Sequence, residues 1–314
     1  MPAIAGEVRR KAAKFYWHLG DFRAIYTFDE DITHQNDHLA QPLSIYAYEN
    51  MAWQDFIDHQ LSAFGDLPVF LALGNHETIQ PKTRDQVLLQ FADWFNSPVI
   101  REQRLKDDPA NRTLRAYYHW REGNIDFITL DNATIDQFDA TQLAWFDALL
   151  KRDLADSSIS TLVLGMHEAL PDSISSGHSM NTSIVGTESG RHVYQELVAA
   201  QAHGHKHIYI LASHSHFFMA NTFNTDYISS HGGVLPGWIV GTAGAVRYAL
   251  PPDSKNAVSP MTNVYGYLLA TVHPDGLIDF DFQKLDESKV PADVVGRYQP
   301  GFVHWCFAEN TQAR

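Results

Sequence analysis

The chain has 314 residues, of which 45% are hydrophobic and 19% are charged, a composition typical of a folded globular protein rather than a disordered one. Its formal net charge of −14 argues against a nucleic acid or an anionic membrane as partner, because the basic footprint of such proteins is missing. Cys306 is the single cysteine, which excludes an internal disulfide and a thiolate metal cluster. No apolar run approaches the roughly 20 residues of a membrane-spanning helix.

Strand-like and helix-like stretches alternate along the chain. Residues 6–14 read as a short basic helix that leads directly into an apolar run. The strand candidates are continuously apolar, which suits strands that are covered on both faces. Two later segments, "YGYLLATVH" and "LIDFDFQK", flank "PDG" and predict a β-hairpin. The predicted strands are 15–20, 68–74, 125–131, 161–167, 208–214 and 237–243, and the predicted helices are 43–64, 83–96, 139–153 (capped by Asp139 or Thr141) and 189–203.

This alternation predicts one α/β domain over residues 1–314. No internal repeat and no linker-like composition divides it. The longest polar segment, residues 171–190, is expected to be a functional loop and not a domain boundary.

Metal-competent side chains come directly after four of the apolar runs. In open α/β sheets, ligands gather at the carboxyl ends of strands, because the loops there converge on one crevice. Oxygen and imidazole ligands without thiolates suit Mn, Fe or Zn. The side chains are Asp21 after "HLG", Asn75 and His76 in "GNHE", His167 in "MHE", and His214 and His216 in "SHSH".

A second histidine cluster provides a comparison, since the chain contains 17 histidines. His203, His205 and His207 precede the strand 208–214, so they belong to its amino end. There they are expected to be solvated at the end of the preceding helix, where cationic side chains favour the helix dipole. His214 and His216 follow the same strand and can face the crevice.

The ordered set "GD … GNHE … MH … SHSH" resembles the motifs of the calcineurin-like metallophosphoesterases, and the likeness spans nearly the whole chain. The resemblance implies a four-layer α/β/β/α sandwich with two mixed β-sheets and a dinuclear metal centre at the carboxyl ends of the strands. It also implies the role of each site residue. Asp21 would bridge two ions, Asn75, His167 and His214 would complete one metal site, His216 would belong to the other, and His76 would assist the leaving group.

Two departures from the family pattern matter. No D-x-H motif precedes Asp21, so the second metal site lacks two ligands. The family carries this motif on a strand ahead of the helix that 6–14 resembles, so the chain is expected to be truncated at its amino end; a one-metal or inactive variant is the alternative. Ala24 stands where purple acid phosphatases have tyrosine, so a tyrosinate-bound iron is not expected.

The predicted function is hydrolysis of a small-molecule phosphate ester, a monoester or a diester, by a metal-activated hydroxide. The cofactors would be divalent transition-metal ions, two in a complete protein and one here. Arg23, His178 and Arg247 are candidate substrate contacts, with a surface salt bridge or solvent exposure as the alternative. A second hypothesis is a non-catalytic or single-metal scaffold of the same fold, which the missing D-x-H favours. The sequence indicates neither a compartment nor an oligomeric state.

Overall fold

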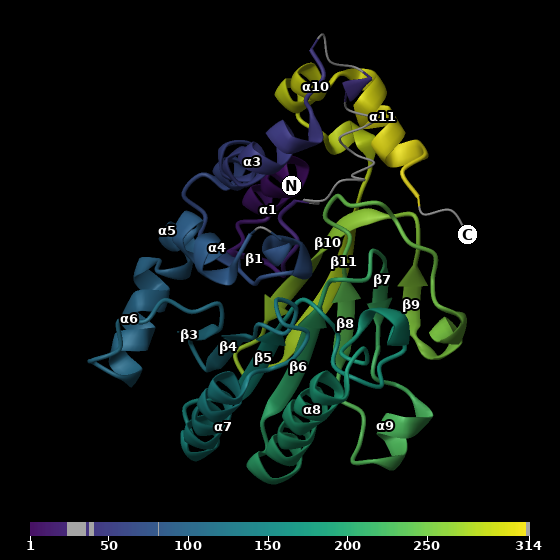
Figure 1. Cartoon of the computed structure of the whole chain (residues 1–314). Helices are drawn as coiled ribbons and strands as arrows, with labels where there is room; N and C mark the ends of the chain where they lie inside the picture. Colours follow the sequence, from purple (N-terminus) through teal and green to yellow (C-terminus); the bar gives the residue numbers. More distant parts are fainter. Residues whose placement is uncertain (24–35, 38–40, 81, 312–314) are drawn as a thin grey trace.

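A computed structural model describes residues 1–23, 36–37, 41–80 and 82–311 of the chain. Ala24, which bears on the expected type of metal centre, lies outside the described residues. Figure 1 shows the course of the chain. The strands are β1 (Tyr16–His18), β2 (Val69–Leu71), β3 (Tyr118–Glu122), β4 (Ile125–Thr129), β5 (Thr161–Gly165), β6 (His207–Ala212), β7 (Phe218–Ala220), β8 (Gly237–Val240), β9 (Val258–Met261), β10 (Tyr265–Val272) and β11 (Ile278–Leu285).

Several helices follow a residue whose side chain satisfies a free backbone N–H group of the first turn. Asp139 accepts a hydrogen bond from the backbone of Gln142, and Ser183 accepts one from Gly186, as N-caps do. The α-helices are α1 (Pro2–Arg10), α3 (Ile45–Phe56), α4 (Arg84–Gln90), α5 (Ala92–Phe95), α6 (Pro98–Asp107), α7 (Ala140–Ala155), α8 (Ile184–Gly204), α9 (Asp226–Ser230), α10 (Ala292–Tyr298) and α11 (Pro300–Ala308).

A seven-stranded mixed sheet forms the centre of the molecule, with the strand order β3-β4-β5-β6-β8-β7-β9. The four central strands β4, β5, β6 and β8 are parallel, so their carboxyl ends meet at one edge of the sheet. Strands β3 and β7 run antiparallel to their neighbours and make the sheet mixed. The loops that follow β5 and β6 therefore emerge side by side.

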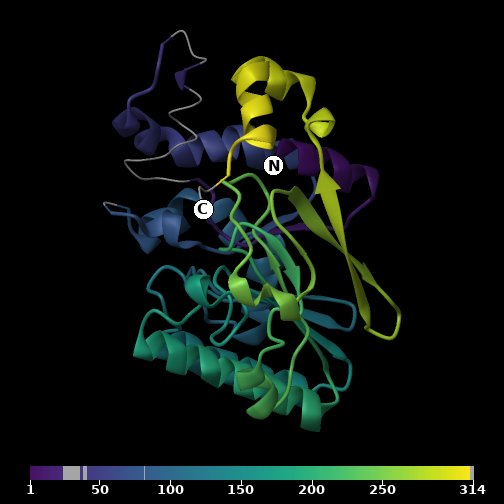
Figure 2. The ribbon, with the colours of Figure 1, turned by 90° about the vertical axis from the view of Figure 1, so that its right-hand side faces the viewer.

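Two smaller ladders lie over one face of this sheet. β1 and β2 pair in parallel, and β10 and β11 form the antiparallel hairpin that the sequence predicts. Figures 1 and 2 show α7 and α8 beneath the large sheet and the amino-terminal helices and carboxyl-terminal helices beyond the smaller ladders. The predicted four-layer α/β/β/α order is confirmed, but the second sheet consists of two separate two-stranded pieces in the described part of the chain.

Each face of the large sheet has its own apolar core. On one face, Leu162 and Ile210 of the sheet pack with Phe146 of α7 and Leu197 of α8. The other core joins the large sheet to the smaller ladders and to α1 and α3, through large side chains such as Trp120. Burial of these faces explains why the strands read as continuous apolar runs.

Several element predictions need correction. Helix α8 begins at Ile184, so the predicted polar loop 171–190 ends about two helical turns earlier than expected. The sequence pattern does not predict β3, β7, β9, α6 or the carboxyl-terminal helices, because these elements are short or carry mixed polar and apolar residues. Within the described residues, none of the helices is both long and apolar enough to cross a membrane.

Candidate metal centre

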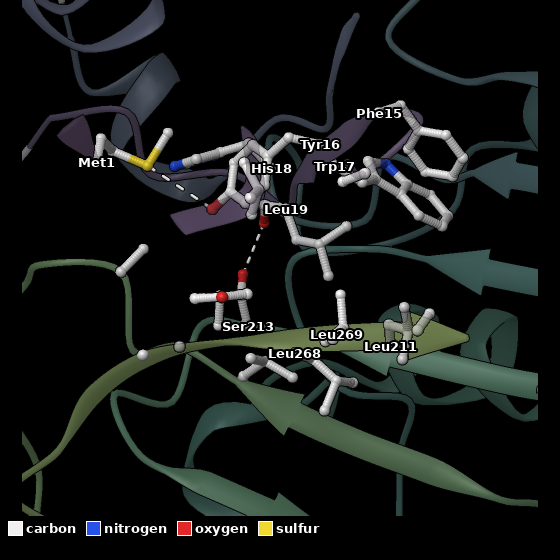
Figure 3. Close-up of a pocket in the computed structure, with 18 of the residues that line it drawn as sticks. Met1, Phe15, Tyr16, Trp17, His18, Leu19, Leu211, Ser213, Leu268 and Leu269 are labelled. Carbon is white, nitrogen blue, oxygen red and sulfur yellow. Dashed lines mark hydrogen bonds between the residues drawn. The ribbon is translucent and has the colours of Figure 1, made fainter. Parts of the chain in front are cut away.

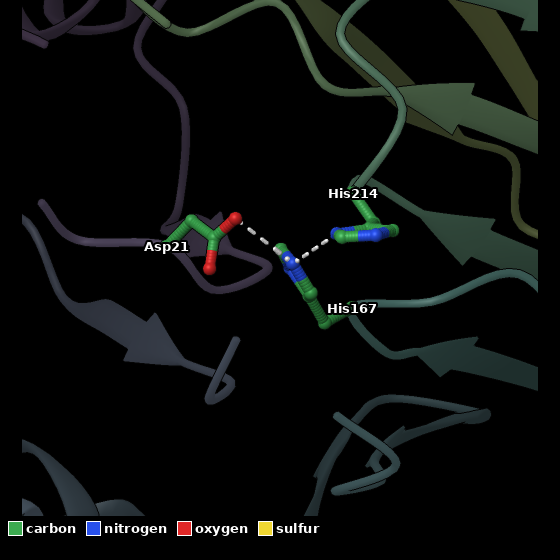
Figure 4. Close-up of side chains that lie close together, drawn as sticks. All are labelled: Asp21, His167 and His214. Carbon is green, nitrogen blue, oxygen red and sulfur yellow. Dashed lines mark hydrogen bonds and ion pairs between the residues drawn. The ribbon is translucent and has the colours of Figure 1, made fainter. Parts of the chain in front are cut away.

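Three side chains from distant parts of the sequence meet at the carboxyl ends of the strands. Asp21 follows β1, His167 follows β5 and His214 follows β6, and their ligand atoms all lie within 4.8 Å of one another. Figure 4 shows the carboxylate of Asp21 and the ring of His214 on either side of His167. The parallel arrangement of β5 and β6 brings the two histidines together, and their ring centroids are 4.8 Å apart.

His167 lies at the centre of the group and is 1% exposed. Its Nδ1–H donates to the backbone carbonyl of Leu19 at 2.8 Å, so Nε2 faces the site and offers a lone pair to a cation that displaces its proton. That atom lies 3.0 Å from Asp21 Oδ2, 3.1 Å from Asn75 Oδ1 and 3.0 Å from His214 Nδ1. One nitrogen cannot donate a hydrogen bond to all three atoms. A shared cation therefore explains this convergence of electron-rich atoms better than hydrogen bonding does.

The donor set fits a first-row divalent ion. It consists of a carboxylate, an amide oxygen and two imidazoles, all of which are ligands of Zn, Mn or Fe in proteins. Ligand atoms that each lie about 2.1 Å from one ion are separated by about 3 Å to 4 Å, which matches the separations around His167. The carbonyl of Leu19 orients His167 as outer partners of ligating histidines do.

The electrostatics of the site follow from burial and close packing. Burial alone would raise the pKa of Asp21, but the imidazoles of His167, His76 and His214 outweigh it and hold the pKa well below its usual range. Burial alone would lower the pKa of His167, but the carboxylate of Asp21 raises it to about 9. Burial and the neighbouring His167 lower the pKa of His214 to about 3. A carboxylate and a neutral imidazole are the forms that bind metals.

Two glycines allow the loops to approach this closely. Asp21 has a φ of 58° and Gly20 a φ of 97°, so the chain turns sharply after β1. A Cβ on Gly74 would lie 2.2 Å from Asp21 Oδ1, which only glycine avoids. The two loops that carry Asp21 and Asn75 are therefore in direct contact.

Glu77 fastens these two loops together, a role that the sequence analysis missed. Its fully buried carboxylate accepts hydrogen bonds from the backbone N–H groups of Gly74, Asp21 and Phe22, at 2.6, 2.8 and 2.7 Å. Burial and the charge of Asp21 raise the pKa of Glu77 to about 8. The only sequence signal was the acidic residue that ends "GNHE".

Three further predicted residues lie around the group. His76 Nε2 is 4.0 Å from Asp21 Oδ2, and the backbone N–H of His76 donates to Asp21 Oδ1 at 3.1 Å. His216 lies outside the group of three; its Nδ1–H donates to Val246, and its ring stacks on Tyr248 with centroids 4.2 Å apart. His178 is half-buried, with its ring centroid 5.3 Å from that of His214.

The two predicted arginines have protein partners. Arg23 forms an ion pair with Asp55 and lines the same cavity as Asp21. Arg247 is 5% exposed, and its guanidinium donates to the backbone carbonyls of Asn263, Phe307 and Asn310. The structure therefore brings Arg23 to the rim of the site and directs Arg247 toward the carboxyl-terminal helix α11.

The second histidine cluster, His203, His205 and His207, lies at the amino end of its strand, as the sequence predicts. His203 and His205 are exposed at the end of α8, and His207 begins β6, at the opposite end of that strand from His214. Position relative to the strand, and not histidine spacing, separates the two clusters.

Fold and site together define an α/β protein with a candidate metal centre at the carboxyl ends of its strands. The chain belongs to the calcineurin-like phosphoesterase family, whose model matches residues 3–218. No curated protein matches the chain.

Three solved structures share the fold. A structure of PhoD is 14% identical with a TM-score of 0.54, and the match covers 91% of this chain and 68% of that one. Purple acid phosphatase PPD1 from yellow lupin (Lupinus luteus) seeds is 15% identical with a TM-score of 0.58, over 90% of this chain and 46% of the other. GAP50, described as the anchor in the inner membrane complex of Plasmodium, is 10% identical with a TM-score of 0.52, over 90% and 78%.

Proposed function

We propose that the protein hydrolyses phosphate esters of small molecules with the help of divalent metal ions held at Asp21, Asn75, His167 and His214. The observation that carries this proposal is the convergence of three electron-rich atoms on Nε2 of His167. Membership of the calcineurin-like phosphoesterase family supports the reaction class.

The proposed roles follow from the position of each side chain. His167, His214 and Asn75 would hold one ion, and Asp21 lies close to both His167 and His76. When bound, the cation would polarise the phosphoryl oxygens and supply hydroxide near neutral pH. His76 donates a proton or a hydrogen bond to the departing alkoxide.

His216 and His178 lie beside the group, and both rings contact Tyr248. We assign His216 to a second ion and His178 and Arg23 to the phosphate or its substituent. The ion pair with Asp55 holds the guanidinium of Arg23 beside the cavity.

Metal binding and turnover of the purified chain test the proposal. After treatment with a chelator, Mn²⁺ titration should show binding, and the loaded protein should hydrolyse p-nitrophenyl phosphate or bis(p-nitrophenyl) phosphate. His214→Ala should lose both properties, and His203→Ala, which removes an exposed histidine from the other cluster, should keep both. Equal effects of the two substitutions would disprove the assignment.

A scaffold without catalytic activity is the second candidate. The described residues provide one group of three ligands and not two, and one structural neighbour, GAP50, is described as an anchor. Mn²⁺ binding that His214→Ala abolishes, without hydrolysis of either ester, would favour this function over the first.

A further inference from the structure

Ser213 lies between the end of β6 and the candidate ligand His214, at the wall of a cavity of about 960 Å³. Figure 3 shows its side chain below Leu19, to which a dashed line joins it. Leu19 follows β1 and precedes the sharp turn that leads to Asp21. The serine therefore lies where the large sheet meets the β1–β2 ladder.

The hydroxyl group of Ser213 has two partners at this junction. Its Oγ lies 2.6 Å from the backbone carbonyl of Leu19, and because a carbonyl only accepts, the hydroxyl donates. The same Oγ lies 3.0 Å from Nδ1 of His167, whose N–H also donates to the Leu19 carbonyl at 2.8 Å. The N–H of His167 is thus shared between two oxygens that are themselves hydrogen-bonded to each other.

The backbone of Ser213 makes a further contact. Its N–H donates to the carbonyl of His167 at 2.9 Å, which joins the segment after β6 to the segment after β5. The hydroxyl reaches the segment after β1, and the next residue along the chain is His214. The three segments that carry the group Asp21, His167 and His214 therefore all meet at this serine.

The contacts of the hydroxyl fix the ring of His167. When Nδ1 faces Leu19 and Ser213, the opposite nitrogen Nε2 faces Asp21 and Asn75. A ligating imidazole must point its lone pair at the ion, so its orientation matters as much as its position. Loss of an outer partner of a ligating histidine typically costs about 10-fold to 100-fold in metal affinity or activity.

We propose that Ser213 is a positioning residue of the metal centre, whose hydroxyl holds both the ring of His167 and the carbonyl of Leu19 in place. This inference rests on the proposed function, because it takes His167 and its neighbours as metal ligands. If the serine only filled space, a methyl group in place of the hydroxyl would leave metal binding unchanged.

Substitution of Ser213 tests this role. Ser213→Ala removes the hydroxyl but keeps the backbone contact with His167, and it should raise the Mn²⁺ dissociation constant at least about tenfold. Ser213→Thr keeps the hydroxyl and adds a methyl group beside the cavity, where there is space for it, so its Mn²⁺ affinity should stay close to that of the wild type. Calorimetric titration of the full chain measures both.

Ser215→Ala is the matched control. Ser215 follows His214 as Ser213 precedes it, and its buried hydroxyl lies 2.5 Å from that of Ser175, without contact to Leu19 or to a member of the metal group. Its loss should lower the thermal stability, because a buried hydrogen bond is removed. The Mn²⁺ dissociation constant should not change.

A second measurement uses the metal-free protein. Nitrogen-edited NMR of the imidazoles should show the Nδ1–H of His167 protected from exchange with solvent. Ser213→Ala should make this exchange at least about tenfold faster, and Ser215→Ala should leave it unchanged. Because the signal reports on the ring of His167 itself, it separates positioning of this ligand from a general loss of stability.

Three outcomes would overturn the role of Ser213. Equal Mn²⁺ affinity of the wild type and Ser213→Ala would show that the hydroxyl does not hold the ligands. Equal losses of affinity in Ser213→Ala and Ser215→Ala would assign the effect to packing of the segment. A folded Ser213→Thr that binds as weakly as Ser213→Ala would show that the hydroxyl is not the active feature.

The design also separates this inference from the proposed function. Absence of Mn²⁺ binding by the wild-type chain would disprove the proposed function, and the exchange rate of the His167 N–H would then decide whether Ser213 holds the ring. Circular dichroism checks that each variant folds. If Ser213→Thr does not fold, the same exchange rate decides.

Discussion

His76 lies beside the metal group without belonging to it, since its ring nitrogen is 4.0 Å from the carboxylate of Asp21. We propose that from this position it assists the leaving group. His167 and His214, in contrast, direct their nitrogens toward each other at 3.0 Å. Substitution by alanine should therefore have different effects on metal binding and on activity at these two kinds of histidine.

We expect His76→Ala to keep its affinity for Mn²⁺ and to lose about 10²-fold to 10⁴-fold in kcat, the usual contribution of a general acid. Calorimetric Mn²⁺ titration and hydrolysis of p-nitrophenyl phosphate measure the two effects. Loss of metal in His76→Ala, together with full metal content in His214→Ala, would contradict the assigned roles.

At the scale of elements, the candidate site depends on the contact between the loop after β1 and the loop after β2. Gly74 lies against the carboxylate of Asp21, and Glu77 binds the backbone of both loops. Neither contact involves a metal ligand of the second loop, yet both determine where the ligands point.

Gly74→Ala should therefore weaken Mn²⁺ binding at least about tenfold, because the new methyl group would displace Asp21. Gly177→Ala is the matched control, since a Cβ there meets nothing within 4 Å. The measurement is the Mn²⁺ dissociation constant of each variant. An unchanged constant in Gly74→Ala would show that the loop can move away without loss of the site.

A second prediction at this scale concerns the β3–β4 edge, where His119 is buried between two carboxylates. Its ring nitrogens lie 2.8 Å from Asp126 and 2.5 Å from Asp107. Burial would lower the pKa of His119, but these carboxylates outweigh it and raise it to about 9. The raised pKa stabilises the folded state fully below the unfolded value of about 6.5, and the stabilisation is lost as pH rises through 9.

The difference in free energy of unfolding between wild type and His119→Gln should fall by about 3 kcal/mol from pH 6 to pH 10. Urea denaturation at several pH values measures it. A difference that stays constant over this range would mean that His119 is neutral in the folded protein.

At the scale of the whole molecule, Arg247 connects the large sheet to the carboxyl-terminal helix. Its guanidinium donates to three backbone carbonyls, two of them near the end of α11. Helix α11 in turn packs against the β10–β11 hairpin, where the ring of Phe307 contacts the ring of Tyr265. Substrate binding by Arg247 stays a prediction, and its Nε and Nη1 already have carbonyl partners.

Arg247→Met should cost about 2 kcal/mol in the free energy of unfolding, because buried carbonyls lose a charged donor. Thermal unfolding and the KM for p-nitrophenyl phosphate are the two readouts. Arg297→Met, which alters an exposed arginine of α10, should leave stability unchanged. A raised KM with unaltered stability in Arg247→Met would instead favour direct contact with the substrate.

The sequence alone predicted the α/β class, the strand ends that carry ligands, and the distinction between the two histidine clusters. These follow from local patterns: continuous apolar runs indicate buried strands, and a polar residue after such a run belongs to the carboxyl end of its strand. The order of "GD", "GNHE", "MH" and "SHSH" was therefore enough to select Asp21, Asn75, His167 and His214 as candidate ligands, and the structure brings these side chains together.

Only the tertiary structure decided how these residues meet. The clamp by Glu77, the stacking of His216 on Tyr248 and the partners of Arg247 join residues that are distant in sequence, and no local pattern encodes such pairings. The split of the second sheet into β1–β2 and β10–β11 likewise depends on which strands are hydrogen-bonded. Strand pairing is a non-local choice, so the partners of each strand become visible only in three dimensions.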